Sequence, residues 1–251
     1  MPLSAACPVQ LYTFALPAAP DAAVLAAAWA VLSTDEQSRA NGFRLAGARN
    51  NFILSRAQLR HCLSVHTGIS SKDLNFCYSD HGKPSLAEQS LGFSLSHSKQ
   101  WLAIAIGRDC ELGVDIEPES PKRAWLAIAE RYFHPDEFRQ LKSLPAQEAQ
   151  KRFFRLWTLK EALLKARGTG IATGLDKASF EFKADLIRVN LANSLKEQGH
   201  TWQVHQWHWS AGCYLALALH HPDPRQHPIE VHLHESLGTL TLMGQGSVRP
   251  A

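Results

Sequence analysis

Hydrophobic and polar residues alternate in several short segments of the first half of the chain, which is the pattern of half-buried strands. The last three of these segments follow one another with short turns between them, so we expect them to form an antiparallel meander. Helical spacing of apolar residues predicts two helices in the same half, at residues 20–33 and 46–66. The strands are expected at residues 9–16, 74–79, 92–98, 101–107 and 111–117.

The pattern becomes helical after Pro118. Two helices are predicted at residues 122–141 and 146–167, the second ending at Gly168, a residue type that commonly terminates helices. Further strands are predicted at residues 178–182, 187–191, 201–208 and 214–219. The segment after residue 221 is rich in proline, histidine and glycine, so we expect residues 222–251 to form a peripheral tail.

One internal similarity indicates how the α+β elements are organised. "HSKQWLAIAI" at residues 97–106 and "SAGCYLALAL" at residues 210–219 both place an aromatic residue after a polar turn, followed by Leu-Ala-aliphatic-Ala-aliphatic. This similarity favours two related α+β halves, with residues 1–119 in the first and 120–221 in the second. The alternative is that two similar hairpins arose by chance.

Composition excludes several classes of protein. The chain has 251 residues, 45% hydrophobic and 20% charged, with a net charge of +3, which fits a soluble globular protein with a mild preference for anionic ligands. The absence of lysine- or arginine-rich runs and base-reading motifs argues against nucleic acid as a partner. Five cysteines without a CxxC pair argue against a disulfide framework. Because we find no signal peptide and no apolar run long enough for a membrane helix, we expect a cytoplasmic protein with no membrane partner.

Two acidic residues share one face of the strand predicted at 111–117. Asp115 and Glu117 are two positions apart, so their side chains project from the same side. Carboxylates that close together either face solvent or share a cation. Hard oxygen ligands of this kind suit Mg²⁺, with Mn²⁺ as the alternative.

The helix predicted at 146–167 carries a second set of charged residues. Glu161 and Lys165 are four positions apart and lie on the same face as Trp157, so one interpretation is an amphipathic helix with a surface ion pair. Considered together with the strand, Glu161 supplies a third carboxylate, and Lys160 and Lys165 are candidates for holding phosphate. Neither a P-loop nor a dinucleotide-binding glycine motif is present.

These two segments together resemble the two-part signature of the 4′-phosphopantetheinyl transferase superfamily. The upstream segments "HGKPSL" at residues 81–86 and "FSLSHS" at residues 93–98 are also similar to family motifs. The resemblance covers roughly residues 36–219 and favours the long, monomeric, broad-specificity, Sfp-like branch. The signature positions that match are Gly113, Asp115, Glu117, Trp157, Lys160, Glu161, Lys165, Gly168 and Gly170.

The resemblance implies a fold of two similar α+β halves related by a pseudo-twofold axis, each a small antiparallel sheet packed against helices. It also implies transfer of 4′-phosphopantetheine from coenzyme A to a serine of an apo acyl or peptidyl carrier protein, releasing adenosine 3′,5′-bisphosphate. Whether the carrier serves fatty acid, polyketide, nonribosomal peptide or siderophore synthesis stays open. So does the identity of the general base, for which Glu161 is the first candidate.

The resemblance further implies a role for each matching residue. Glu161 and Lys165 are the candidate catalytic residues. Asp115, Glu117 and Glu161 are the expected metal ligands, and the cleft between the two halves is the expected site. The residues expected to bind coenzyme A are Lys83, Ser96, His97, Asp115, Lys160, Glu161 and Lys165, with Arg39 and Arg49 as candidates for its 3′-phosphate.

Two alternatives come from other functional classes. The same three carboxylates would serve a metal-dependent hydrolase of pyrophosphate-containing metabolites, with water as the nucleophile. A non-catalytic module that binds coenzyme A or a carrier is the second alternative. An absolute requirement for carrier protein would separate the transferase from the hydrolase. The intact Asp115, Glu117, Glu161 and Lys165 argue against the non-catalytic module.

Overall fold

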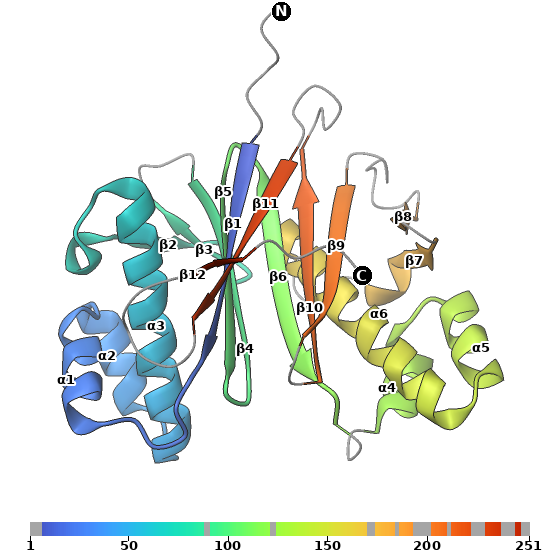
Figure 1. The fold of residues 1–251 in the computed structure, drawn as a ribbon, viewed down its shortest axis with the longest axis horizontal. Coiled ribbons are helices and arrows are strands. Elements are labelled where there is room, and N and C mark those ends of the chain that lie inside the picture. The colour runs from blue at the N-terminus through green and yellow to red at the C-terminus, as the bar shows by residue number, and fades with distance from the viewer. Residues whose placement is uncertain are drawn as a thin grey trace, which may run out of the picture.

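Two β-sheets face each other in the middle of the molecule, and helices cover both outer sides (Figure 1). The computed structural model describes residues 7–87, 91–120, 124–169, 174–183, 186–192, 202–209, 212–221, 229–236 and 244–246. Apolar side chains from both sheets, among them Leu11, Ala105, Val114 and Leu217, form a core between the sheets. Two further cores lie between each sheet and its own helices.

The first sheet contains five strands in the order β12-β11-β1-β5-β4. Its central pairs, β1 with β5 and β5 with β4, are antiparallel, whereas β1 and β11 are parallel. Three helices pack on its outer face through the second core (Figure 1). The elements are β1 (Cys7–Ala15), α1 (Ala22–Ala30), α2 (Thr34–Asn41), α3 (Ala46–Thr67), β4 (Leu91–Ser98), β5 (Trp101–Arg108), β11 (Ile229–Ser236) and β12 (Gly244–Gly246), with the small pair β2 (Phe76–Tyr78) and β3 (Pro84–Leu86) beside them.

The second sheet contains three antiparallel strands in the order β6-β10-β9. Helix α6 packs along β6 and β10, and the shorter helices α4 and α5 lie on the side of α6 that faces away from this sheet (Figure 1). The elements are β6 (Glu111–Pro118), α4 (Trp125–Tyr132), α5 (Pro135–Ser143), α6 (Ala146–Arg167), β9 (Trp202–Trp209) and β10 (Cys213–His220). The strands β7 (Ala178–Phe182) and β8 (Ile187–Leu191) form a separate antiparallel pair.

Local sequence explains where the helices begin and end. Helix α2, which the hydrophobic pattern did not predict, starts with a capping box in which Ser33 and Glu36 bond each other's backbone N–H groups. Helix α6 ends at Gly168, which adopts the left-handed conformation (φ 67°). The helices α3 and α6 contain 22 residues each, and within the described residues no helix is long and apolar enough to cross a membrane.

The single helix predicted at residues 122–141 is wrong. The described part of this segment forms two helices, α4 and α5, because Pro135 starts the second of them. Proline disfavours the helical conformation in the residue before it, and both Phe133 and His134 are extended. The predicted bounds of α6, β7 and β8 are confirmed.

The predicted antiparallel meander is correct for β4 and β5 but wrong for the third segment. Strand β5 already pairs with β4 on one side and β1 on the other, so neither of its edges is open to β6. Strand β6 therefore leaves the first sheet and pairs with β10. The two segments whose sequences resemble each other become β5 and β10, each flanked by a strand on both sides.

The expected peripheral tail is also wrong for Ile229–Ser236. This segment is strand β11, which pairs with eight residues of β1 from Cys7 to Phe14. The prediction rested on the composition of the whole segment, whereas Ile229–Ser236 itself contains neither proline nor glycine. An α+β fold with small sheets and helices is confirmed, while the division into halves at residue 119 and the pseudo-twofold axis stay predictions.

Candidate active site

Side-chain hydroxyls join the two sheets where strand β4 runs beside strand β6. Three serines at alternate positions of β4 point towards β6. The Oγ atom of Ser94 accepts a hydrogen bond from the backbone N–H of Val114 (3.1 Å). Ser96 donates to Asp115 Oδ1 (2.8 Å), and Ser98 donates to Glu117 Oε2 (2.8 Å). This row of serines therefore positions both carboxylates of the β6 motif.

Lys165 of helix α6 meets Asp115 and Ser96 at this junction. Its Nζ atom lies 2.7 Å from Asp115 Oδ1 and 2.8 Å from Ser96 Oγ. Asp115 is 4% exposed, so the ion pair is largely desolvated on its carboxylate side. Strand β4, strand β6 and helix α6 each contribute one residue to this cluster, which we call the Asp115 junction.

A close backbone contact brings helix α6 to the strand. A β-carbon added to Gly113 would lie 2.1 Å from the carbonyl oxygen of Ala162 and 2.3 Å from the backbone nitrogen of Ala166. Only glycine allows this approach. Because Asp115 lies on the same face of β6 two residues later, the contact places its carboxylate within reach of Lys165.

A pocket of about 220 Å³ opens beside the Asp115 junction. Glu161, Leu164, Lys165 and Gly168 line it from one face of α6 and the residue that ends the helix. The opposite wall comes from the turn at residues 81–84 and from residues 93–95 of β4. Acidic, basic and apolar groups therefore face one cavity, as in a site for a charged organic ligand.

Lys83 ties the turn at residues 81–84 to the end of helix α6. Its Nζ atom donates a hydrogen bond to the carbonyl oxygen of Ala166 (2.5 Å), where the helix leaves carbonyl groups unsatisfied. Burial lowers the pKa of Lys83, while the nearby Glu111 and Cys110 oppose that change. The predicted nucleotide-binding lysine therefore lines the pocket and also caps the helix.

His97 lies at the surface next to the junction. Loss of hydration, and then the positive charge of Lys165, lower the pKa of its imidazole. Because the His97 side chain is exposed to solvent, we expect desolvation to lower its pKa only modestly. His97 is therefore a neutral imidazole near neutral pH, able to donate one hydrogen bond and accept another.

The three expected metal ligands are only partly brought together. Asp115 has a buried second oxygen, Oδ2, that makes no hydrogen bond within the described structure, and Glu161 lies in the pocket wall. Glu117 is held by Ser98 further along β6. Within the described ranges, no group of three histidine, cysteine, aspartate or glutamate side chains is placed to hold a metal ion. The unsatisfied oxygen of Asp115 nevertheless fits one ligand position, because a buried carboxylate oxygen needs a donor or a cation.

Lys160 is not brought to the pocket. Its Nζ atom bonds the carbonyl oxygens of Leu175 and Ala178 and lies 2.7 Å from Glu137 Oε2. These contacts occupy all three ammonium hydrogens. Lys160 was expected to help hold the pyrophosphate or a local ion network, and its position supports only the second role.

Arg39 and Arg49 also lie apart from the described pocket wall. The guanidinium of Arg39 stacks on Phe52, and that of Arg49 stacks on Trp29, at 5.3 and 5.1 Å from the ring centroids. Both side chains pack on rings of the first half, and neither is among the residues that line the cavity. Their expected role towards a 3′-phosphate stays a prediction.

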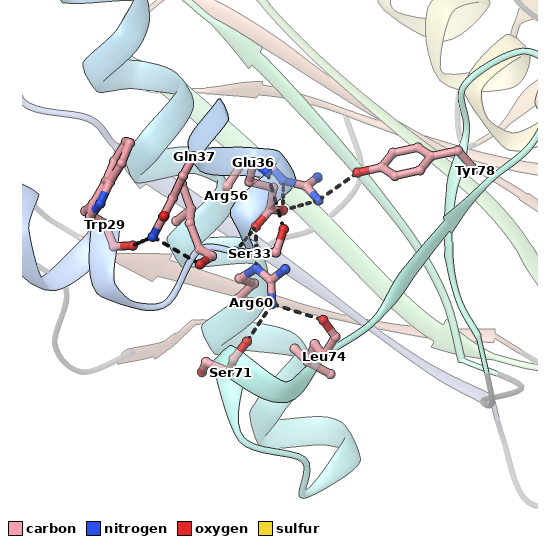
Figure 2. A network of polar contacts seen from close by, with 10 residues as sticks. Trp29, Ser33, Glu36, Gln37, Arg56, Arg60, Ser71, Leu74 and Tyr78 are labelled. Carbon is pink, nitrogen blue, oxygen red and sulfur yellow. Dashed lines mark hydrogen bonds and ion pairs between the residues drawn. The ribbon is translucent and has the colours of Figure 1, made fainter. Parts of the chain in front are cut away.

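Two other arginines in this half are buried around one glutamate (Figure 2). Arg56 and Arg60 each donate to Glu36 at 2.6 Å, and Arg60 also bonds the carbonyl oxygens of Ser71 and Leu74. Burial alone would raise the pKa of Glu36, but the charge of Arg56 and hydrogen bonds from Ser33 and Arg60 lower it. The network joins α2, α3 and the segment before β2.

The roles of Ser94 and Ser98 were missed from the sequence. Their signal was present, because Ser94, Ser96 and Ser98 alternate and so share one face of the strand. The sequence lacked any sign that β6 would lie opposite that face. Gly170, the last position of the signature, lies outside the described residues.

Comparison with known proteins finds 4′-phosphopantetheinyl transferase matches in both parts of the chain. Residues 111–228 match the family described as "4′-phosphopantetheinyl transferase superfamily", and residues 19–108 match "4′-phosphopantetheinyl transferase, N-terminal". The chain is 42% identical to the 4′-phosphopantetheinyl transferase HetI of a Nostoc species over 147 residues, which are 57% of this chain and 62% of HetI. It is 24% identical to the 4′-phosphopantetheinyl transferase Sfp of Bacillus subtilis over 193 residues, which are 76% of this chain and 84% of Sfp.

The match to HetI spans less than two thirds of that relative's length. The crystal structure of Thermotoga maritima holo-[acyl-carrier-protein] synthase aligns with a TM-score of 0.36 at 18% identity, over 44% of this chain and 62% of that one. The two family matches follow each other along the sequence and together include β4, β6 and α6, which build the Asp115 junction. The chain belongs to the 4′-phosphopantetheinyl transferase superfamily.

Proposed function

We propose that this protein transfers 4′-phosphopantetheine from coenzyme A to a serine hydroxyl of an apo carrier protein. The observation that supports it most is the Asp115 junction, which joins both signature segments beside a pocket lined by Lys83, Glu161 and Lys165. This pocket offers cationic groups for phosphate and a carboxylate within one cavity. The names of the relatives support the same activity.

The reaction requires a nucleophile that the chain does not supply. The oxygen of the carrier serine attacks the phosphorus that bears the pantetheine arm, and the bond from this phosphorus to the bridging oxygen breaks. Adenosine 3′,5′-bisphosphate leaves with that oxygen. The serine proton passes to a base, for which the carboxylate of Glu161 is the candidate because it faces the pocket.

Lys165 and His97 would orient the phosphates, and Lys83 and Ser96 would lie beside the nucleotide end. The Lys165 ammonium already spans Asp115 and Ser96, so its position is preorganised before substrate arrives. Lys83 lines the same cavity from the opposite wall. The residues therefore act by positioning and by balancing phosphate charge.

A divalent cation, Mg²⁺ or alternatively Mn²⁺, would be held by Asp115, with Glu117 and Glu161 as the other candidate ligands. The buried Oδ2 atom of Asp115, which lacks a hydrogen bond in the described structure, supports this assignment. When bound, the cation neutralises negative charge on the pyrophosphate. Carboxylate oxygens are the ligand type that both ions prefer.

The proposed partners are coenzyme A and an acyl or peptidyl carrier protein, acted on by a monomer. An apo carrier with a negatively charged helix suits a protein with a net charge of +3. A hydrolase with the same carboxylates gains no support from the structure or from the relatives. We therefore retain the transferase as the single proposed activity.

Intact-protein mass spectrometry tests this proposal. An apo carrier protein is incubated with this protein, coenzyme A and Mg²⁺, with and without EDTA. We expect the carrier to gain the mass of one phosphopantetheine group, and the gain to disappear with EDTA. Consumption of coenzyme A without modification of any carrier would instead indicate hydrolysis.

Two lysine variants provide a matched control. Lys165→Met removes the ammonium of the Asp115 junction, and we expect modification to fall at least about tenfold. Lys72→Met makes the same change at an exposed position outside the pocket and should leave the rate unaltered. Equal rates for both variants would contradict the proposed role of the junction.

A further inference from the structure

Glu137 and Lys160 form an ion pair in the core between helices α5 and α6. Their Oε2 and Nζ atoms lie 2.7 Å apart, and the two side chains are 4% and 0% exposed. The Lys160 ammonium also bonds the carbonyl oxygens of Leu175 and Ala178. All three of its hydrogens therefore point into the protein.

Both carboxylate oxygens of Glu137 also accept hydrogen bonds from the backbone. Its Oε1 atom accepts a hydrogen bond from the backbone N–H of Phe180 (2.9 Å), and Oε2 accepts one from the N–H of His134 (3.3 Å). The pair thus connects α5, α6, strand β7 and Leu175, which lies just before that strand. A buried pair with satisfied hydrogen bonds holds its elements in one arrangement.

The geometry of helix α6 separates Lys160 from the proposed substrate. Lys160 and Lys165 are five residues apart, which rotates their side chains about 140° from each other around the helix axis. Glu161 and Lys165 line the pocket, whereas the Lys160 ammonium lies near the rings of Phe133 and Phe180, 5.1 and 5.8 Å from their centroids. Contact between Lys160 and a ligand in the pocket would require the helix to rotate.

We propose that Glu137 and Lys160 are a positioning pair, which fixes helix α6 so that Glu161 and Lys165 face the pocket, and that Lys160 does not contact the substrate. The inference rests on the proposed transferase function and identifies Glu137 as a further residue on which that function depends. Its physical basis is the tight fit of α6 on Gly113 and the 2.7 Å contact between Lys165 and Asp115. A small rotation of the helix would break that contact.

A double-mutant cycle tests the pair. The variants are Lys160→Met, Glu137→Met and the double substitution, with Lys165→Met as the control for a residue in the pocket. Each is measured for its Tm, its kcat and KM for coenzyme A in carrier modification, and its affinity for coenzyme A by calorimetry. Methionine replaces either side chain with an unbranched apolar one of similar length.

We expect both single variants to lose about 10 °C in Tm, because each leaves one buried charge unpaired. Both should lower kcat by similar factors while KM for coenzyme A changes less than about threefold. The double variant should recover most of both losses, since no unpaired charge remains. Lys165→Met should instead weaken coenzyme A binding about tenfold, and Glu137→Met should not reverse that loss.

A different pattern would overturn the inference. If Lys160→Met weakens coenzyme A binding about tenfold while Glu137→Met does not, Lys160 contacts the substrate directly. The same conclusion follows if the double variant stays as impaired as Lys160→Met alone. Should a single variant fail to fold, Lys160→Arg and Glu137→Asp take its place, and an unchanged kcat in both would equally contradict the positioning role.

These measurements distinguish this inference from the proposed function. If the unaltered protein modifies no carrier, the transferase proposal fails, but coenzyme A affinity and Tm still report on the pair. A cycle in which the two Tm losses simply add would show that Glu137 and Lys160 act independently. The positioning pair would then be rejected whatever the activity.

Discussion

Gly113 of strand β6 and Ala162 of helix α6 lie in direct backbone contact, so close that a β-carbon on the glycine would sit 2.1 Å from the alanine carbonyl oxygen. The contact involves backbone atoms on the helix side, which cannot move aside as a flexible side chain could. It sets the distance between the strand that carries Asp115 and the helix that carries Lys165.

Gly113→Ala should destabilise the protein by about 3 kcal/mol, because the added methyl group forces the helix away from the strand. The same shift should separate Lys165 from Asp115 and abolish carrier modification. Urea unfolding and the mass assay measure the two effects. Gly47→Ala is the control, since a β-carbon there meets nothing within 4 Å, and a stability loss as large in that variant would refute the explanation.

Ser96→Ala should lower kcat/KM about tenfold, which corresponds to roughly 1.5 kcal/mol for one hydrogen bond to a charged group. The serine hydroxyl donates to Asp115 and accepts from Lys165, so its loss leaves both groups less well oriented. Steady-state kinetics with a carrier protein measure the change. Ser94→Ala, which removes only a hydrogen bond to the backbone of Val114, should affect kcat/KM less; the reverse order would argue against the junction.

Lys165→Met should raise the pKa of His97. The positive charge of Lys165 adds to the effect of desolvation in lowering that pKa, so removing the charge makes the protonated imidazole less unfavourable. An NMR titration of the His97 ring follows the change directly. Lys72→Met should leave the titration unaltered, and an unchanged His97 titration in Lys165→Met would show that the two groups do not interact.

Glu36→Gln should destabilise the protein by about 3 kcal/mol at neutral pH, because Arg56 and Arg60 lose the carboxylate that both contact. The pKa of Glu36 is lowered in the folded state from an ordinary value of 4.5, so its stabilising effect is complete above pH 4.5 and is lost as pH falls through the lowered value. The stability difference between the two proteins should therefore shrink in acid.

Urea unfolding at a series of pH values, from neutral to well below 4.5, measures this difference. The exposed Glu130→Gln serves as the control and should change stability little at any pH. A difference for Glu36→Gln that stays constant down to the most acidic condition would mean that the carboxylate carries no lowered pKa.

A chain ending at His221 should associate with itself. Strand β11 pairs with eight residues of β1. Its removal therefore leaves the backbone N–H and C=O groups along that edge of β1 unpaired, and such an edge can pair with another chain. Size-exclusion chromatography with light scattering at several concentrations would detect the association. A chain ending at Ser236, which keeps β11, is the control, and a stable monomer in both cases would show that β11 does not protect this edge.

The sequence by itself determined the local elements and the candidate chemistry. The spacing of apolar residues predicted α6, β7 and β8 with their correct bounds, because helix and strand periodicities are local properties. Alternation along β6 placed Asp115 and Glu117 on one face, and the signature motifs indicated the family. Each of these inferences depends only on neighbours along the chain.

The tertiary structure decided what faces each of those residues. Strand periodicity shows that Ser94, Ser96 and Ser98 share a face, but only the path of β6 shows that this face meets Asp115 and Glu117. Lys160 and Lys165 look alike in the helix sequence, yet one bonds Glu137 in the core and the other bonds Asp115 beside the pocket. The reason is physical: the rotation of a helix about its axis is fixed by what packs against it, such as Gly113, and those partners are distant in the chain.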